Sequence, residues 1–407
     1  MRVLFLDAYF EPEQIAFTHL EHDLLEGLVN TGHEVEIVCP TPTRGISQDK
    51  AKAYKKRKSE YMFTKHVHIT RFSAPQEGKN PIIRALRYFW CNLRTYQIGK
   101  DVKDIDAVFC NSTPPTQGWI AGKVAKKLNV PLIYSLQDVF PDSLVTTGMT
   151  SKDSVLWKIG RKLEDATYKR CKKIIVISDA IKKNLIQKGV NSRKLEVISN
   201  WIDTDAIRPV PREKNKLFDE FGIDRNKFIV LYAGNFGAAQ GAEIVLEAAE
   251  MLKDQKDIQF VIFGGGAGYQ DAVVKASIMP NVFIHPLMPQ DRVADVYSMG
   301  NVAIITCKKG VGKSGMPSKT WSIMACNTPI IAAFDVDSEM YRILLESKSG
   351  RCIEAEGKDA LIEELLSSLN NMGDSNGREF VTQFCSKANC VKKYIDEMRQ
   401  ACENTND

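Results

Sequence analysis

A stretch of glycines and lysines reads KKGVGKSGMPSKTW over residues 308–321, and its first part resembles the end of a nucleotide-triphosphate P-loop. The P-loop pattern G-x-x-x-x-G-K-[ST] requires a glycine where this chain has Cys307. In a P-loop a helix begins directly after the lysine, whereas Pro317 intervenes here. Pro317 and Ser318 instead predict a helix that begins near residue 318, with Lys319 in its first turn. A lysine there opposes the helix dipole unless an anion is bound, so Lys319 is a candidate phosphate ligand.

Two glycine-bearing loops follow strand-like runs in the same half of the chain. They read AGNFGAAQG over residues 233–241 and FGGGAG over residues 263–268. Loops of this kind present backbone amides to a phosphate or a sugar at the edge of a parallel sheet. Neither spacing matches the dinucleotide pattern, and tight strand-to-helix packing explains a single glycine equally well. Together with the lysine at a helix start, however, they indicate a phosphate-binding site.

The first half offers carboxylates in similar positions. The segment QDVFPDS over residues 137–143 follows a strand-like run, and Asp138 and Asp142 could bind a substrate or cap a helix. Glu11 and Glu13 follow the first strand-like run and leave the same two interpretations open. The histidine pairs have no third ligand at a suitable spacing, so we expect no metal site.

Apolar, β-branched runs alternate twice with amphipathic stretches along the chain. This pattern predicts an α/β protein with two doubly wound, Rossmann-like domains that face each other across a cleft. Expected strands of the first domain are 3–8, 34–40, 67–72, 107–112, 131–138 and 173–178, with helices at 13–30, 81–100, 116–128 and 152–170. Expected strands of the second domain are 228–237, 258–268, 281–287, 302–308 and 329–334. We predict domains at 1–200 and 228–385, a polar linker at 201–227, and a C-terminal helix at 386–407 that packs back on the first domain.

The composition of the 407 residues, 44% hydrophobic and 26% charged, is typical of a folded globular protein. No apolar run approaches the roughly 20 residues of a membrane-spanning helix, and we expect no secretion signal. The ten cysteines contain no CxxC pair, which favours reduced thiols in a cytoplasmic protein.

The net charge of +5 hides an asymmetry between the two halves. Residues 1–200 carry 32 Lys and Arg against 21 Asp and Glu, whereas the rest of the chain carries 23 against 29. The basic residues gather at 55–58 and in the aromatic-rich segment 81–100. Such a segment is typical of contact with an anionic membrane or a phosphate-bearing substrate, and a solvated lysine-rich helix face is the alternative. We expect no nucleic-acid partner, because no RNA-binding motif or zinc finger accompanies these residues.

Several motifs, in order, resemble the family-four retaining glycosyltransferases of GT-B fold across nearly the whole chain. They are GHEVEIV (32–38), VISDAIKKNLIQKGV with ISNWIDTDAIRP (176–209), YAGNFGAAQG (232–241), VIFGGGAG (261–268) and MPSKTWSIMACNTPIIA (316–332). The resemblance is to bacterial cell-surface polysaccharide enzymes, including the N-acetyl-L-fucosamine transferase type. It implies transfer of a hexosyl or N-acetylhexosaminyl group from a nucleotide-sugar held mainly by the second domain, with UDP-linked N-acetylated sugars favoured.

The chain departs from that family at several donor contacts. The usual arginine and lysine that grip the diphosphate are Asn235 and Gln240 here, and the usual glutamate pair falls on Ser314 and Ser322. The histidine often found in the first domain is replaced by Gln137 and Asp138. Positive charge for the departing diphosphate can still come from Lys319, beside Ser318 at a helix start.

The glycine loops, the start of the helix at residue 318 and the first-half carboxylates supply the candidate residues. The diphosphate would lie on the amides around Gly234–Gly241 and on Ser318 and Lys319, with the base near Leu287 and Met288 and the sugar near Gly315 and Met316. The donor-binding candidates are Gly234, Asn235, Phe236, Gly237, Gln240, Gly265, Leu287, Met288, Ser314, Gly315, Met316, Ser318, Lys319 and Ser322. The catalytic candidates are Asp138 and Lys319, and the acceptor-binding candidates are Glu11, Glu13, Gln137 and Asp142.

The expected acceptor is a polyprenyl-diphosphate-linked glycan of capsule, O-antigen, lipopolysaccharide or other exopolysaccharide synthesis. The basic first domain would then lie on the inner face of the plasma membrane, as a monomer or homodimer, and no metal or other cofactor is expected. Two alternatives stay open. A nucleotide-sugar 2-epimerase of the same fold would need paired acids and a histidine around one sugar, and the absence of the glutamate pair leaves room for a non-catalytic sugar-nucleotide-binding protein.

Overall fold

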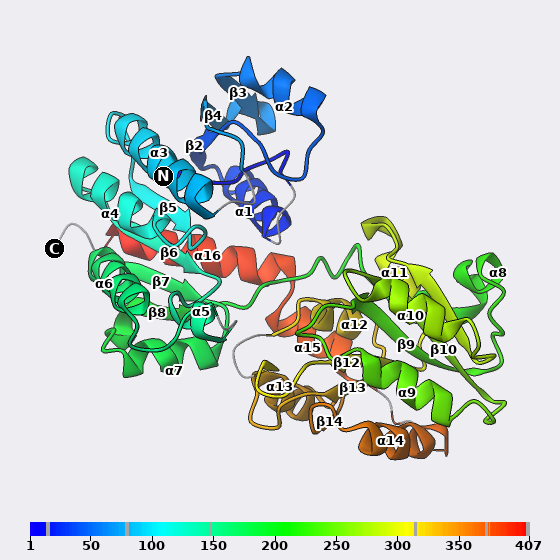
Figure 1. Cartoon of the computed structure of the whole chain (residues 1–407). Helices are drawn as coiled ribbons and strands as arrows, with labels where there is room; N and C mark the ends of the chain where they lie inside the picture. The colour runs from blue at the N-terminus through cyan, green and yellow to red at the C-terminus, as the bar shows by residue number, and fades with distance from the viewer. Residues whose placement is uncertain are drawn as a thin grey trace. The chain divides into compact units, whose positions relative to one another are not determined.

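A computed structural model describes residues 1–13, 17–77, 81–146, 149–312, 316–370, 373 and 375–403. The chain divides into two compact units: one contains Met1–Asn200 and the residues from Cys390 onward, and the other contains Trp201–Asn389. Each unit is an α/β layer structure built on one sheet (Figure 1). The predicted fold class, with two Rossmann-like parallel sheets flanked by helices, is confirmed. No helix in the described part of the chain is both long and apolar enough to cross a membrane.

The sheet of the first unit has the strand order β3-β4-β2-β1-β5-β6-β7-β8, and only β3 runs antiparallel to its neighbour. Its strands are β1 (Arg2–Leu6), β2 (Glu34–Pro40), β3 (Ser59–Met62), β4 (Val67–Phe72), β5 (Ala107–Asn111), β6 (Leu132–Leu136), β7 (Lys173–Val176) and β8 (Leu195–Val197). Its helices are α1 (Thr18–Asn30), α2 (Gln48–Lys55), α3 (Pro81–Gly99), α4 (Gln117–Leu128), α5 (Asp142–Thr146), α6 (Val155–Arg170), α7 (Asp179–Gln187) and α16 (Lys387–Glu403), which starts in the second unit. Alternate strand residues face opposite layers, so Leu4 packs toward α3, α4 and α6 while Phe5 contacts Phe109 on the other face.

The sheet of the second unit is parallel, with the order β11-β10-β9-β12-β13-β14. Its strands are β9 (Phe228–Asn235), β10 (Ile258–Gly265), β11 (Val282–Pro286), β12 (Val302–Thr306), β13 (Ile330–Ala333) and β14 (Gly350–Ile353). Its helices are α8 (Leu217–Glu220), α9 (Glu243–Met251), α10 (Tyr269–Ala276), α11 (Val293–Met299), α12 (Lys319–Ala325), α13 (Glu339–Ser347), α14 (Lys358–Asn370) and α15 (Gly377–Phe384). Two hydrophobic clusters, one on each face of this sheet, form its core.

The segment 201–227, expected as a linker, is packed into the second unit. Leu217 and Phe218 of α8 are buried in its core. The Arg378 guanidinium donates hydrogen bonds to the carbonyl oxygens of Ile207, Ala325 and Thr204 at 3.2, 2.7 and 3.0 Å. These bonds tie the segment to α12 and α15, so the polar composition that suggested a linker belongs to the surface of a folded unit.

The C-terminal helix α16 packs against α1 in the first unit, and Gly27 of α1 lies at the contact. A β-carbon built on Gly27 would lie only 2.2 Å from Cγ1 of Val391. Tyr394 contacts Phe109 on the sheet, and its hydroxyl lies 3.1 Å from Oγ of Ser135. The absence of a side chain at position 27 therefore allows α1 and α16 to approach closely.

We expect the substitution Gly27→Val to lower the free energy of unfolding by about 1–3 kcal/mol, because the added methyl groups overlap Val391. Denaturant unfolding of purified variants measures this change. The double variant Gly27→Val/Val391→Ala should recover part of the loss, since the two residues are in contact. An equal loss in the wild-type and Val391→Ala backgrounds would contradict this packing.

Candidate functional site

The loops after three neighbouring strands of the second unit meet at one edge of its sheet. Gly234 and Asn235 end β9 and pair with Gly264 and Gly265 at the end of β10. The amide of Phe236 donates to the carbonyl of Gly265 at 2.7 Å, which fixes the loop after β9 against β10. Carboxyl ends of parallel strands are where α/β sheets bind their ligands.

Close packing at this edge depends on glycine. Gly266 has φ +92°, and a β-carbon there would lie 1.6 Å from Oδ1 of Asn235. A β-carbon on Gly265 would lie 3.0 Å from the Leu287 side chain, which follows β11. The predicted donor-binding residues Asn235, Gly265 and Leu287 are thus neighbours.

Lys319, the first residue of α12, points its ammonium group at the end of β9. Its Nζ donates to the carbonyl of Ala233 at 3.3 Å and lies 4.6 Å from the centroid of the Tyr232 ring. A β-carbon on Gly234 would lie 2.8 Å from this Nζ. No acidic side chain among the described residues forms an ion pair with Lys319, and desolvation lowers its pKa to about 8. An ammonium group without a carboxylate partner, beside a glycine edge, is suited to bind an anionic ligand.

The remaining donor candidates take different places. The backbone amide of Gln240 donates to the Gly237 carbonyl at 3.0 Å, and Oε1 of its side chain would lie 2.8 Å from a β-carbon on Gly237. Ser318 is exposed and forms the N-cap of α12 without a side-chain capping bond, and Ser322 lies one turn later on that helix. Met288 and Met316 pack against the core of the unit. Ser314 and Gly315 lie outside the described residues.

The loop that resembles a P-loop is held by Asp335, a residue that the sequence pattern did not indicate. The carboxylate of Asp335, two residues after the end of β13, accepts hydrogen bonds from the amides of Gly310 and Gly312, both at 2.9 Å. Lys308 and Lys309 form ion pairs with Glu356 and Glu354. The amides of Gly310 and Gly312 and these two lysines thus already have partners within the protein, whereas Lys313, the lysine of the P-loop-like sequence, lies outside the described residues. The position of Asp335 after a buried strand was the only signal in the sequence.

In the first unit, Gln137 and Asp138 directly follow β6. The Gln137 amide donates to Oγ of Ser112 at 3.0 Å, and its side-chain oxygen accepts from Asn200 at 2.9 Å. Asp138 is exposed at this edge, and partial desolvation by its surroundings raises its pKa above the ordinary value. Gln137 is therefore fixed by the fold, whereas Asp138 is available to a ligand.

The other three acceptor candidates have partners within the first unit. Asp142 accepts from Lys188 at 2.9 Å and from Asn184 at 3.1 Å. Glu11 lies 2.6 Å from Nδ1 of His22.

Glu13 is fully buried and accepts from the amides of Thr43 and Arg44 at 2.7 and 2.8 Å. Burial raises its pKa above the ordinary value. The contacts of Glu13 hold the backbone of Thr43 and Arg44, and those of Asp142 tie the start of α5 to Lys188.

A buried pair of carboxyl groups at the end of β1 was missed from the sequence. Asp7 lies beside Glu21 of α1 and Asn111 of β5, and burial raises its pKa to about 7. Burial and the neighbouring Asp7 raise the pKa of Glu21 as well. The only indication of this pair in the sequence is that Asp7 directly follows a run of apolar residues. Among the described residues, no cluster of three or more His, Cys, Asp or Glu side chains could hold a metal ion.

The two halves of the chain match two families of known proteins. Residues 21–206 match Glycosyltransferase Family 4, and residues 213–383 match Glycosyl transferases group 1. The chain is 26% identical over 343 residues to the probable glycosyltransferase WbjE of Pseudomonas aeruginosa, covering 81% of this chain and 85% of WbjE. It is 24% identical over 283 residues to the putative colanic acid biosynthesis glycosyl transferase WcaI of Escherichia coli, covering 68% and 69% of the two chains.

Solved structures show the same fold at lower identity. Sucrose-phosphate synthase of Thermosynechococcus elongatus has a TM-score of 0.72 at 15% identity, with 98% of each chain covered. HepE of Anabaena, solved in complex with UDP, has a TM-score of 0.70 at 13% identity and covers 98% of this chain and 100% of its own. The first half of the chain is therefore similar to Glycosyltransferase Family 4 and the second half to Glycosyl transferases group 1, and both halves have the Rossmann-like fold of GT-B glycosyltransferases.

Proposed function

We propose that this glycosyltransferase moves a sugar, with retention at the anomeric carbon, from a nucleotide-sugar to a lipid-linked glycan during surface polysaccharide synthesis. The donor is a UDP-linked hexose or N-acetylhexosamine. The observation that carries the proposal is Lys319, a desolvated ammonium group without a described carboxylate partner, at the glycine edge of the group 1 domain. HepE, which has this fold, was solved in complex with UDP, and this supports a nucleoside diphosphate as part of the ligand.

In the proposed reaction, the bond between the anomeric carbon and the β-phosphate oxygen breaks, and the acceptor oxygen bonds to the same carbon on the same face. The largest developing charge lies on the departing nucleoside diphosphate, which Lys319 stabilises. The acceptor hydroxyl gives its proton to a phosphate oxygen of the leaving group. No metal takes part, and the test is undiminished turnover after treatment with a chelator.

The acceptor side of the proposal rests on the first unit. Asp138 orients the acceptor hydroxyl, since it is exposed beside the fixed Gln137. The excess of basic residues in residues 1–200 favours an acceptor that carries a diphosphate and sits in an anionic bilayer. The name of WcaI, which refers to colanic acid biosynthesis, supports a role in polysaccharide synthesis. The basic residues of the first unit would place this synthesis on the inner face of the plasma membrane.

One assay separates this proposal from its rivals. The purified protein is incubated with UDP- and GDP-sugars and polyprenyl-diphosphate-linked glycans, and both nucleoside diphosphate release and acceptor mass are measured. Release that depends on the acceptor, with one sugar added, supports the transferase. Release without acceptor that yields an epimer would identify a 2-epimerase, and binding without turnover would identify a sugar-nucleotide-binding protein.

A methyl group at Gly234 offers a way to displace the ammonium group without removing it. We expect Gly234→Ala to lower kcat by about tenfold or more, because its β-carbon would lie 2.8 Å from Nζ of Lys319. The control is Gly122→Ala in α4 of the first unit, away from the donor-binding candidates, whose β-carbon would meet Cδ of the flexible Arg170 side chain at a similar distance, 2.7 Å. Steady-state kinetics with a saturating donor measures both variants, and equal losses would contradict a specific role for the Lys319 position.

A further inference from the structure

The first unit exposes an apolar helix face that no described part of the chain covers. On α3, Ile83, Leu86, Trp90 and Leu93 recur at helical spacing and are all exposed, with Leu86 at 65%. The opposite side of this helix, with Arg87, Cys91 and Thr95, is buried. A surface helix normally turns its apolar stripe inward and its polar face outward, so the outward apolar row on α3 requires a partner.

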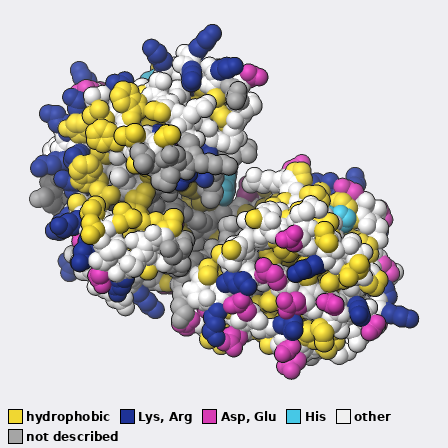
Figure 2. All heavy atoms as spheres, viewed as in Figure 1, with side chains coloured by type: hydrophobic (Ala, Val, Ile, Leu, Met, Phe, Trp, Pro, Cys, Tyr) yellow, Lys and Arg dark blue, Asp and Glu magenta, His cyan; other side chains and the backbone are white. Residues whose placement is uncertain are grey.

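The same layer continues through α4 to α6. Helix α4 packs against α3 on one side and α6 on the other. On α6, Val155, Leu156 and Ile159 are exposed at 76%, 52% and 61%. Figure 2 shows hydrophobic side chains gathered over this part of the first unit, with Lys and Arg side chains around them. The apolar surface therefore extends over several helices instead of a single position.

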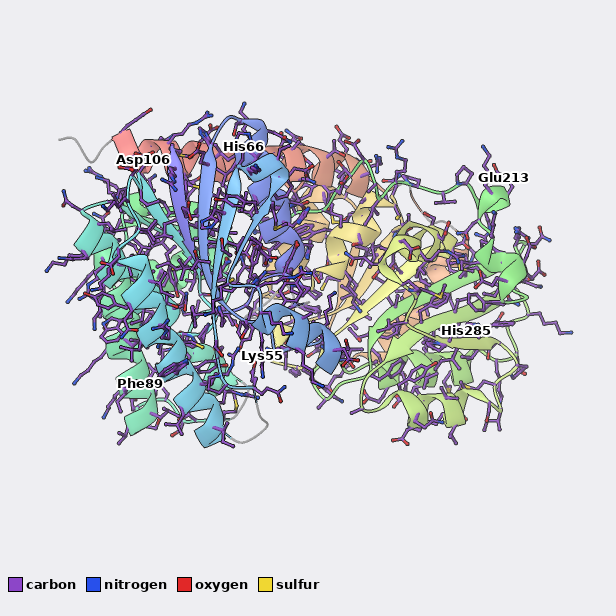
Figure 3. The ribbon with its side chains drawn as sticks, turned by 90° about the horizontal axis from the view of Figure 1, so that it is seen from above. Lys55, His66, Phe89, Asp106, Glu213 and His285 are labelled. Atoms are coloured by element: carbon purple, nitrogen blue, oxygen red, sulfur yellow. The ribbon has the colours of Figure 1, made fainter. Side chains whose placement is uncertain are left out.

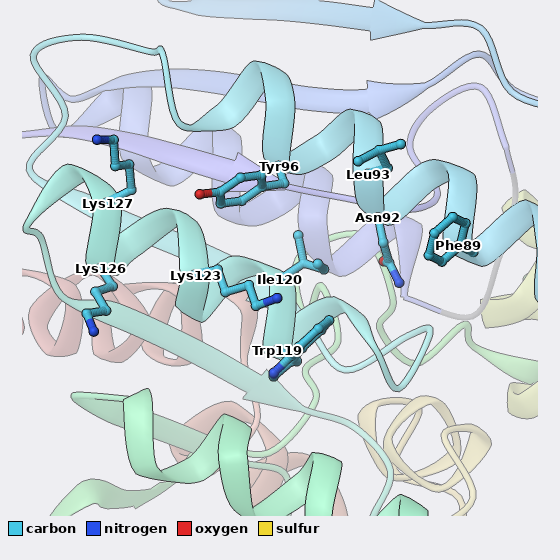
Figure 4. A pocket seen from close by; sticks show the side chains of 9 residues that line it. All are labelled: Phe89, Asn92, Leu93, Tyr96, Trp119, Ile120, Lys123, Lys126 and Lys127. Carbon is cyan, nitrogen blue, oxygen red and sulfur yellow. The ribbon is translucent and has the colours of Figure 1, made fainter.

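A groove of about 650 Å³ lies between α3 and α4. Phe89, Leu93 and Tyr96 line it from α3, and Trp119 and Ile120 line it from α4 (Figure 4). Its size and apolar lining suit a hydrocarbon chain.

The charged side chains that line the groove are all positive. Asn92 of α3 and Lys123, Lys126 and Lys127 of α4 complete its lining, and Nζ of Lys123 lies 3.5 Å from the centroid of the Trp119 ring. Neither α3 nor α4 contains an aspartate or glutamate. On α6, the exposed Lys158 and Lys162 flank the apolar residues. Apolar side chains next to lysines, without acidic neighbours on α3 and α4, are the pattern of a surface that lies in the headgroup region of an anionic bilayer.

We propose that the groove between α3 and α4, together with the apolar rows of α3 and α6, is a docking surface for a bilayer that contains anionic phospholipid. The apolar rows enter the acyl boundary, one lipid chain lies in the groove, and the lipid phosphate binds the three lysines of α4. The inference rests on the proposed function, because it places the acceptor domain on the membrane that holds a lipid-linked acceptor.

The test measures binding of the full chain to vesicles of phosphatidylcholine with and without phosphatidylglycerol. We expect binding only with phosphatidylglycerol, weakened by salt, and accompanied by a blue shift of tryptophan fluorescence that Trp90→Phe/Trp119→Phe reduces. The variant Lys123→Glu/Lys126→Glu/Lys127→Glu should weaken binding by about tenfold or more.

The matched control is Lys55→Glu/Lys56→Glu/Lys58→Glu, which makes the same change of net charge on exposed lysines. Lys55 belongs to α2, a different helix from the one that carries Phe89 (Figure 3). Equal losses in both triple variants would overturn the docking surface, because only overall charge would then matter. Equal binding to neutral vesicles, or self-association of the chain that is lost in Leu86→Ser/Phe89→Ser, would overturn it too.

Vesicle binding needs no turnover, and donor turnover with a soluble acceptor needs no vesicle. The two assays therefore fail separately. A chain that binds vesicles but transfers no sugar would contradict only the proposed function, and a chain that transfers sugar but ignores anionic vesicles would contradict only the docking surface.

Discussion

Replacing Lys319 by alanine is expected to lower kcat by roughly 30- to 1000-fold, which corresponds to about 2–4 kcal/mol of transition-state stabilisation. The physical reason is that the departing diphosphate gains charge as the glycosidic bond breaks, in a place where burial has already removed much of the water around Nζ. A fixed ammonium group needs no reorganisation at that moment, so its contribution is larger than that of a charge in water. Donor binding should weaken less than kcat falls, because the charge on the diphosphate is smaller before the bond breaks.

The matched control is Lys309→Ala. Lys309 is an exposed lysine of the neighbouring loop that pairs with Glu354 at 2.8 Å, and its removal should change kcat by less than about twofold, as expected for a surface ion pair. Thermal unfolding of both variants shows whether they remain folded. A folded Lys319→Ala enzyme with wild-type kcat would refute the assigned role.

The edge around Lys319 was predictable because its signals are local. Runs such as FIVLYAGN read as buried strands, a glycine loop follows, and Pro317 marks a helix start, so the sequence alone placed β9 and α12 correctly. Parallel strands align their carboxyl ends, and this rule then brings loops distant in the chain to one edge. Short strands with exposed or mixed residues, such as β3 and β14, gave no such signal and were missed.

The carboxylates of the first unit were harder to interpret, because their roles depend on partners far away in the chain. Asp142 follows β6 as a ligand-binding residue would, yet it pairs with Lys188 beyond the end of α7. Glu21 lies in the first turn of α1, where a carboxylate usually stabilises an exposed helix end, and only the packed structure shows that it is buried beside Asp7. Burial and pairing are tertiary properties, and the sequence pattern carries little information about them.

The pH dependence of kcat/KM for the donor should reveal the ionisation of Lys319 directly. An ordinary lysine has a pKa near 10.4, so it would keep its charge up to about pH 10. Because desolvation lowers the pKa of Lys319 to about 8, we expect kcat/KM to fall about tenfold per pH unit above pH 8. Tyr232, the titratable group that faces Nζ, has a pKa raised by burial to about 12 and does not titrate in this range.

The bound donor should also shift the pH dependence of kcat relative to that of kcat/KM. A diphosphate beside Nζ favours the charged amine, so the falling limb of kcat should lie at higher pH than that of kcat/KM. Unfolding does not explain the fall in kcat/KM. Burial disfavours the charged Lys319 amine in the folded state, and this cost to stability shrinks as the pH rises from 8 toward the pKa of an unfolded lysine. The ionisation of Lys319 therefore raises the free energy of unfolding over that pH range. A flat kcat/KM up to pH 9.5, or the same falling limb in Lys319→Ala, would show that another group titrates.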